Sequence, residues 1–194
     1  MKRDTILSPD KFKSSFLSCE KDCETILKKL FVTSQPYSDD LKRLLVINMP
    51  DCLDNKSNQL YNYKIKQMSL PTLKNEGYIK LTPKFSMEEH QEVKSYIVIS
   101  FDNFSNTNNT EFRDCTISFD ILCHTDCWDL GNFRLRPLKI AGYIDGILNK
   151  AKLSGIGTLE FVSCRELLLD EELSGYTLTY RAVHGSDDSI PGVD

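Results

Sequence analysis

The stretch from Thr116 to His184 constrains the fold of this chain most, because its residues alternate in hydrophobicity over whole strand lengths. In TISFDILCH, residues 116–124, apolar side chains take alternate positions, a pattern typical of a strand with one buried face. Residues 157–164 and 176–184 alternate in the same way, whereas residues 136–152 carry their apolar residues at helical spacing. The order strand, helix, strand, strand predicts an α+β fold with a mainly antiparallel sheet.

The N-terminal part predicts a long amphipathic helix. Apolar residues recur every three or four positions across residues 9–33, and Pro9 suits the first turn because its missing N–H has no partner there. Ser8 precedes it as a candidate N-cap. Residues 1–8 are expected to form a polar leader.

The segments that follow are less regular. Residues 41–48 fit either a strand or a helix, residues 62–70 alternate weakly around Tyr63 and Ile65, and residues 77–85 predict an edge strand that Pro83 ends. The continuous apolar run at 95–101 predicts a central strand.

We therefore expect a single α+β domain over residues 9–184. Residues 102–113, DNFSNTNNTEFR, are too rich in asparagine to pack in a core and predict a protruding arm between two antiparallel strands. Residues 185–194, GSDDSIPGVD, predict a flexible acidic tail.

Composition excludes several classes of protein. The net charge is -4 and the isoelectric point about 5.5, with no basic stripe of the kind that follows a nucleic-acid backbone. No apolar run approaches the roughly 18 residues of a membrane span, and the N-terminus has no apolar signal core, so we expect synthesis in the cytoplasm and no membrane contact. Seven cysteines, an odd number, argue against a disulfide framework.

The motifs offer little chemistry. Cys123, His124 and Cys127 fall within zinc-ligand spacing, but a structural site needs a second pair of ligands, and Cys123 also continues the apolar face of its strand. A zinc-binding or regulatory module built on these residues remains the weaker alternative. No histidine pairs with a nucleophile in a recognisable pattern. The sequence thus predicts no catalytic residues, no metal and no cofactor.

The remaining candidates are surfaces for assembly. Two arginines precede the second helix, where cations oppose the helix dipole and could instead serve a partner carboxylate. An acidic turn separates the last two strands and offers a charged docking surface. The candidate contact residues are Asn103, Asn106, Asn109 and Phe112 in the arm, Arg134 and Arg136 before the helix, and Asp170, Glu171 and Glu172 in the turn.

The second half of the chain resembles the tail terminator and tail completion (neck) proteins of tailed bacteriophages. The resemblance covers roughly Tyr96 to His184. It is carried by TISFDILCH, the arginine-rich helix entry RLRPLKIAGYIDGILNK, the strand TLEFVSCRE, and Gly175-Tyr176 at the start of YTLTYRAVH. It rests on element order and pattern, and it leaves residues 41–73 as a possible insertion.

The resemblance implies a curved antiparallel sheet with the second helix packed on one face. It implies a non-enzymatic virion protein that forms a ring, usually a hexamer, at the tail end or in the neck. Its partners would be further copies of itself, tail tube proteins and neck proteins, while DNA would pass through the lumen without specific binding. A head–tail connector or completion protein of the neck is the neighbouring possibility.

Overall fold

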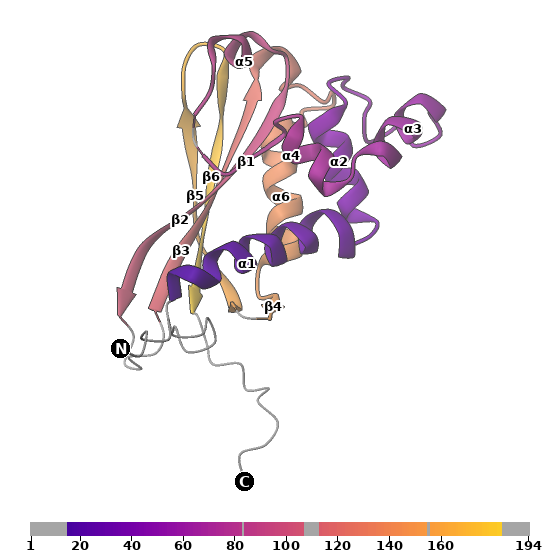
Figure 1. The fold of residues 1–194 in the computed structure, drawn as a ribbon. Helices are drawn as coiled ribbons and strands as arrows, with labels where there is room; N and C mark the ends of the chain where they lie inside the picture. The colour runs from indigo at the N-terminus through magenta and orange to yellow at the C-terminus, as the bar shows by residue number, and fades with distance from the viewer. Residues whose placement is uncertain (1–14, 83, 107–112, 155, 184–194) are drawn as a thin grey trace, which may run out of the picture.

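The computed structural model describes residues 15–82, 84–106, 113–154 and 156–183; at 15–18, 106, 113, 114 and 183 it describes the backbone alone. The fold is α+β, as predicted, with a curled, mostly antiparallel sheet and a layer of helices packed on it (Figure 1). The helices in chain order are α1 Ser15–Lys28, the π-helical turn η2 Lys29–Thr33, α2 Tyr37–Val46, α3 Gln59–Gln67, α4 Leu70–Asn75, α5 Met87–Gln91, the 3₁₀ turn η3 Thr125–Cys127 and α6 Arg136–Leu148. The strands are β1 Ile79–Lys80, β2 Ser95–Asn106, β3 Arg113–His124, β4 Lys152–Leu153, β5 Gly157–Leu168 and β6 Leu173–Val183.

Within the described residues, the strands lie in the order β1-β2-β3-β6-β5-β4. The long strands β2, β3, β6 and β5 are antiparallel to their neighbours, and only the two-residue β1 runs parallel to β2. The strands predicted at 95–101, 116–124, 157–164 and 176–184 are confirmed, each within a longer strand, except that His184 lies outside the described residues.

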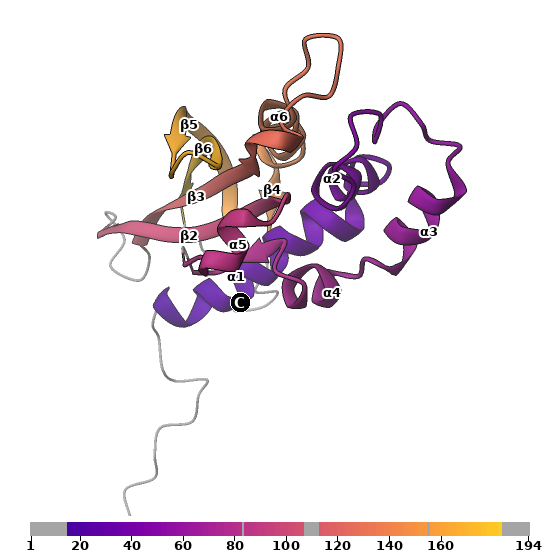
Figure 2. The same cartoon turned by 90° about the horizontal axis from the view of Figure 1, so that it is seen from above.

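The core lies between the sheet and the helices. Alternate residues of β3, from Cys115 to Cys123, are buried against the helical layer, and so are Leu178 and Tyr180 of β6. Helix α6 crosses β3 and β6, and Tyr180 donates a hydrogen bond to the Asp145 carboxylate at 2.9 Å. Seen from above, α2 and α1 extend the helical layer beyond α6 (Figure 2).

The opposite face of the sheet is polar except at one end. There Tyr96, Leu122 and Leu173 form a small second core, with Phe85 packed against them beside α5. Further along this face Thr177 donates to Asp120 at 2.6 Å, which joins β6 to β3 through polar side chains.

Several elements differ from the sequence predictions. Residues 62–70, which alternate weakly in the sequence, belong mostly to α3, because Asn58 caps the helix by accepting hydrogen bonds from the N–H groups of Leu60 and Tyr61. Residues 41–48 are largely helical in α2. The helix expected at 136–152 ends at Leu148, because Lys150 turns to positive φ and its N–H bonds to the Leu159 carbonyl.

The described part of the predicted N-terminal helix is helical as far as Thr33, although η2 widens its last turn. The predicted leader and the start of that helix lie outside the described residues, as does the tail from 185 to 194. The edge strand expected at 77–85 is only the two residues of β1, at an outer edge of the sheet.

Candidate functional site: the open edge of the sheet

Strand β5 is the least covered long element of the described fold. From Glu160 to Leu168 it pairs with β6 on one side, and no described strand lies on its other side. The short β4 pairs only with Gly157 and Thr158. Backbone hydrogen bonds join Lys150 and Ala151 to Leu159, which is the last residue of β5 covered from this side. Alternate N–H and C=O groups beyond Leu159 therefore point away from the sheet, as at any free strand edge.

Apolar side chains are exposed along this edge. Val162 is 56% exposed and Leu168 71% exposed, and Phe161 and Leu169 are each 44% exposed. The Phe161 ring contacts the Tyr180 ring edge to face, with 6.1 Å between the ring centroids, and the rest of the Phe161 side chain is exposed to solvent. The strand contains neither lysine nor proline, two residues with which proteins commonly block strand pairing at an edge. The strand has a bulge between Phe161 and Ser163 and carries the charged residues Glu160, Arg165 and Glu166.

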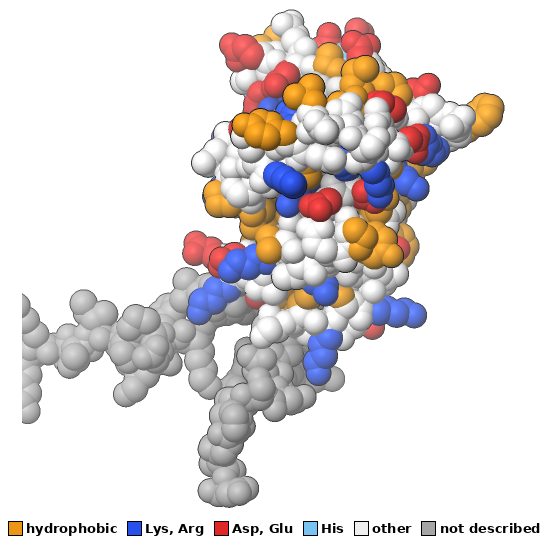
Figure 3. Space-filling view, turned by 90° about the vertical axis from the view of Figure 1, so that its right-hand side faces the viewer, with side chains coloured by type: hydrophobic (Ala, Val, Ile, Leu, Met, Phe, Trp, Pro, Cys, Tyr) orange, Lys and Arg blue, Asp and Glu red, His pale blue; other side chains and the backbone are white. Residues whose placement is uncertain are grey.

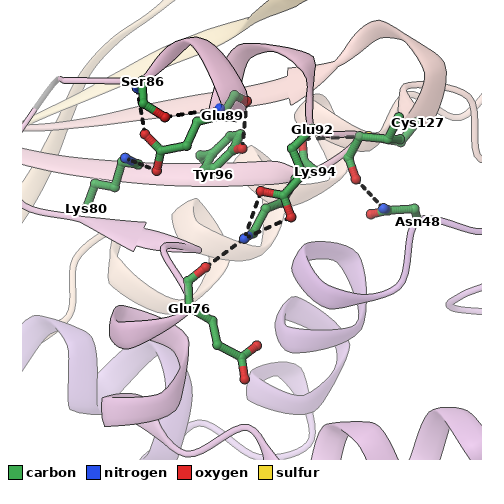
Figure 4. A network of polar contacts seen from close by, with 10 residues as sticks. Asn48, Glu76, Lys80, Ser86, Glu89, Glu92, Lys94, Tyr96 and Cys127 are labelled. Atoms are coloured by element: carbon green, nitrogen blue, oxygen red, sulfur yellow. Dashed lines mark hydrogen bonds and ion pairs between the residues drawn. The ribbon is translucent and has the colours of Figure 1, made fainter.

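The opposite edge of the sheet is covered only at its β1 end, where a polar network surrounds α5 (Figure 4), because β1 pairs with Ile97 and Val98 alone. The ammonium of Lys94 donates to the Glu76 carbonyl at 2.6 Å and lies 4.3 Å from the centre of the Tyr78 ring. Lys80 of β1 bonds to Glu89 at 2.6 Å, and Glu89 also completes a capping box with Ser86. These contacts hold β1 and α5 over the end of β2, so the two edges of the sheet differ in accessibility.

The predicted arm is partly described. Asn103 is exposed, has φ of 50° and lies in the irregular stretch where the β2–β3 register shifts between Asp102 and Ser105. The backbone of Asn106 pairs with Arg113 at the end of the hairpin. Asn109 and Phe112 lie outside the described residues. The two strands of the hairpin diverge from α6 toward the end of the molecule where β6 also ends (Figure 1).

The two predicted arginines have different environments. Arg134 lies near the surface, where its guanidinium pairs with the Asp54 carboxylate, one N–O distance being 3.0 Å. The side-chain hydrogen bond to Asp54 raises the pKa of Arg134 and lowers the pKa of Asp54. The predicted partner carboxylate therefore exists within the chain.

Arg136 is fully buried, so its assignment as an assembly contact is wrong for this conformation. Its guanidinium donates to five backbone carbonyls, four of which belong to the end of α2 and the residues that follow it. The acceptors are Leu44 at 2.7 Å, Ile47 at 2.8 Å, Asn48 at 2.9 Å, Met49 at 3.1 Å and, from η3, Cys127 at 2.5 Å. Carbonyls at a helix C-terminus carry partial negative charge, which explains how the cation is stabilised there.

The acidic turn is partly occupied by its own contacts. Asp170 accepts hydrogen bonds from the N–H groups of Glu172 at 2.8 Å and Leu173 at 2.7 Å, and its other oxygen contacts His90 of α5. The N–H of Leu173 is the main cause that lowers the pKa of Asp170. Glu171 and Glu172 have exposed side chains. Asp170 therefore holds α5 to the hairpin, and only its two neighbours offer free carboxylates.

Cys123, His124 and Cys127 are close together but do not converge on one point. Cys123 lies in the core, where burial raises its pKa to about 12. His124 accepts a hydrogen bond from the Asp126 N–H through Nδ1 at 3.2 Å, and Cys127 Sγ donates to the His124 carbonyl at 3.2 Å. The described part of the chain contains no group of three or more His, Cys, Asp or Glu placed to hold a metal ion. The residues present thus serve as a helix cap and as core.

The exposed apolar residues of β5 were not among the site residues predicted from the sequence. Two signals point to them in retrospect: the adjacent pair Phe161-Val162 and the run Leu167-Leu168-Leu169 place apolar side chains on both faces of one strand. A strand buried on one face needs apolar residues on that face alone.

Comparison with known proteins gives one family and one solved structure. None of the described helices is long and apolar enough to cross a membrane. No curated protein matches the chain. A chain in the solved virion of a native gene transfer agent (GTA) particle is similar at 15% identity and a TM-score of 0.40, over 64% of this chain and 91% of that chain. The model of the YomW family matches residues 38–182, which include α6 and every described strand except the last residue of β6. The chain belongs to the YomW family.

Proposed function

We propose that this chain is a non-enzymatic structural subunit of a tailed-bacteriophage particle. Copies of it would form a ring, with six as the expected number, that terminates the tail or joins it to the neck. The proposal combines the sequence resemblance to tail terminator and tail completion proteins with one structural observation. That observation is the difference between the open, apolar edge of β5 and the closed edge at β1.

A free strand edge recruits another strand through main-chain hydrogen bonds, and apolar side chains on both faces add buried area. The β2–β3 hairpin of a neighbouring copy is a suitable partner, because β2 beyond Val98 has no described strand on its outer side. A contact between β5 of one copy and the predicted arm at 102–113 of the next joins two unlike surfaces. Such head-to-tail contacts close into a ring when the rotation permits.

The chain's charge supports a passive role toward DNA. With a net charge of -4, it lacks the excess of lysine and arginine that grips a phosphate backbone. A lumen lined by such subunits would let DNA pass without specific binding. The exposed Glu171 and Glu172, at the end of the molecule away from Val183, are candidate contacts to a neighbouring tail tube or neck protein.

The edge contact is tested by native mass spectrometry and negative-stain microscopy over a range of protein concentrations. We expect closed rings for the natural chain and a strong shift to monomer for Val162→Lys/Leu168→Lys, because both substitutions place charge on the open edge. Leu60→Lys on α3 is the matched control, since Leu60 is 71% exposed like Leu168 but lies away from the sheet. Rings that survive the β5 substitutions, or that Leu60→Lys disrupts equally, would show that β5 is not the contact.

The placement in a particle needs a separate test. Tailed particles purified from cells that carry the gene should contain the chain in a fixed ratio to the tail tube protein, and an antibody against it should label the neck or tail end. Absence of the chain from purified particles would contradict a virion role while leaving the edge contact intact.

A further inference from the structure

Phe133 is the most exposed of the large apolar side chains that the structure describes. Its relative exposure of 106% means that no described residue covers its ring. It lies in the loop between η3 and α6, which projects beyond the body of the molecule (Figure 2). Loops of this kind commonly carry small or polar residues, because a large apolar side chain there stays in contact with water. The fold of the single chain therefore does not explain this phenylalanine.

The loop around Phe133 has a strained backbone. Gly131, Asn132 and Phe133 have positive φ values of 74°, 52° and 60°. Glycine and asparagine tolerate this left-handed region, whereas a phenylalanine there costs free energy because its Cβ approaches the following carbonyl oxygen. Two hydrogen bonds close the loop: the N–H of Leu130 donates to the Arg134 carbonyl at 2.9 Å, and the N–H of Arg134 donates to the Gly131 carbonyl at 3.0 Å. A loop constrained in this way loses little conformational freedom when it binds a partner.

A pocket of suitable size and chemistry lies between α2 and α6 of the same chain. Its volume is about 460 Å³, and its lining residues are Tyr37, Lys139, Gly142, Tyr143, Gly146 and Ile147. Both helices belong to the helical side of the molecule, which exposes apolar side chains among lysines and arginines (Figure 3). The ring centroids of Tyr37 and Tyr143 are 6.2 Å apart, so a third aromatic ring can pack beside them. A Cβ built on Gly142 or Gly146 meets nothing within 4 Å, which leaves the backbone of α6 open to an incoming side chain.

The Phe133 loop and the pocket lie toward opposite ends of one exposed face of α6. Leu135, Leu138, Gly142 and Gly146 follow one another at spacings of three or four residues, and all four are exposed. Phe133 comes three residues before α6 begins, and both glycines lie in its second half. A second copy of α6, packed antiparallel on the first, therefore brings each Phe133 to the glycines of the other helix. Leu135 then faces Gly142, and Leu138 lies near the two-fold axis.

The Phe133 loop and the pocket also lie on the same side of α6. Arg134 pairs with Asp54, which follows α2, so the loop lies toward α2. The pocket includes Tyr37 at the start of α2. A two-fold rotation that reverses the direction of α6 keeps this side in common, so it brings each loop to the pocket of the other copy.

The loop and the pocket carry opposite charges. Lys139 lines the pocket and forms no ion pair with any residue that the structure describes. Asp129 is exposed at the base of the loop, where its backbone forms a β-bridge with Leu135. Because Lys139 lies near the two-fold axis of the antiparallel pair, Asp129 of the other copy offers it a carboxylate.

The area available for this contact is small. An aromatic side chain buries about 150–250 Å², so two Phe133 side chains contribute about 300–500 Å². The exposed parts of Leu135, Leu138 and Tyr37 add to this area in both copies. A specific interface needs about 1,000 Å² in total, so the contact should be weak and should form only at high protein concentration.

We propose that two copies of the chain pair through α6, with Phe133 of each copy inserted into the pocket between α2 and α6 of the other. The same surface is used on both copies, so the assembly closes at two. The pairing goes beyond the proposed ring, because the ring contact uses β5 and the β2–β3 hairpin. Neither contact requires the other.

Sedimentation velocity at high protein concentration tests the pairing. The Val162→Lys/Leu168→Lys chain serves as the background, so that association through β5 does not contribute. We expect a monomer–dimer equilibrium in this background, and we expect Phe133→Ala to raise the dissociation constant at least about ten-fold. Met87→Ala is the matched control, because Met87 is 76% exposed on α5 and should leave the constant unchanged. A chain that stays monomeric at the highest attainable concentration, or a dimer that Phe133→Ala leaves intact, would overturn the proposal.

Phe133→Gly separates a role in pairing from a role in folding. Glycine adopts positive φ without strain, so this variant should melt at a higher temperature than the natural chain. The same variant should lose pairing to the same extent as Phe133→Ala. A lower melting temperature would show that Phe133 supports the fold of the single chain, which contradicts the proposal.

Photochemical cross-linking identifies the surface that Phe133 contacts. The probe is Phe133→benzoylphenylalanine in a mixture of ¹⁴N-labelled and ¹⁵N-labelled chains, and the linked peptides are identified by mass spectrometry. We expect links between copies that end on Tyr37, Tyr143 or Ile147, whereas the same probe at Met87 should not give them. Gly142→Phe fills the pocket and should weaken pairing as Phe133→Ala does, while Glu88→Phe, which adds a ring to exposed α5, should not. Links only within one copy, or pairing that Gly142→Phe leaves unchanged, would refute insertion into this pocket.

Discussion

The buried guanidinium of Arg136 offers the sharpest test of what holds the helices to the sheet. Replacing it by methionine removes five donors and leaves the carbonyls at the end of α2 without their partner. A hydrogen bond to a charged group contributes about 1.5–3 kcal/mol, but five bonds to one group are not additive. Each buried carbonyl left without a donor costs about 1–3 kcal/mol, and part of that cost is relieved by water, so we expect Arg136→Met to lower the free energy of unfolding by about 4 kcal/mol.

This loss is large against the roughly 5–15 kcal/mol that stabilises a typical domain. Arg136→Lys should cost less, about 2 kcal/mol, because an ammonium keeps the charge and three of the donors. Arg134→Met is the matched control two residues away: its ion pair with Asp54 is partly exposed, so we expect a much smaller loss. Urea denaturation followed by circular dichroism measures all three variants.

Either of two results would contradict this expectation. One is an Arg136→Met variant that unfolds at the same urea concentration as the natural chain, which would mean that the carbonyls find water readily. The other is an Arg134→Met variant as unstable as Arg136→Met, which would assign the effect to the whole segment that leads into α6.

Three further predictions concern single positions. Gly175→Ala should destabilise the chain by at least about 3 kcal/mol, because the new Cβ would lie 1.8 Å from the Ile121 carbonyl oxygen. A Cβ added at Gly146 meets nothing within 4 Å, so Gly146→Ala should instead stabilise α6 by about 0.5–1 kcal/mol. The melting temperatures of the two variants should therefore shift in opposite directions. Asp170 has a lowered pKa in the fold, so the stability that its carboxylate provides is complete above its unfolded pKa of about 3.9 and is lost as the pH falls through the folded pKa. Asp170→Asn should remove this part of the pH dependence. Denaturation midpoints measured at several pH values across that range test the prediction. Ser86→Ala should cost about 1 kcal/mol by removing the capping box of α5, and hydrogen exchange should show faster opening of α5 than of β3.

The sheet could be predicted from the sequence, because a half-buried strand is the structure that strict alternation over eight or more residues favours. Residues 116–124 are the clearest example, since the alternate apolar positions from Ile117 to Cys123 are buried against the helices. The helical N-terminal half was harder. In residues 62–70 the alternation was weak, and the capping side chain of Asn58, which starts α3, lies outside that window.

The environment of the site residues could not be predicted by the same means. Arg134 and Arg136 look equivalent in the sequence, but one pairs with Asp54 at the surface while the other reaches carbonyls about ninety residues earlier in the chain. Only the tertiary fold brings α2 to that position. The exposure of β5 likewise depends on the tertiary fold, because α6 packs on β3 and β6 and leaves the side chains of β5 exposed.

The unequal edges of the sheet have a consequence for the way in which copies of the chain would self-associate. If β5 of one copy pairs with the β2–β3 hairpin of the next, every open arc keeps one unsatisfied β5 and one unsatisfied hairpin at its ends, whatever its size. Each copy that joins an arc forms one contact and loses its own translational freedom, whereas closure adds a contact without immobilising another copy. Complete rings would therefore be favoured over partial arcs. The population would divide mainly between single chains and complete rings, with a steep dependence on protein concentration.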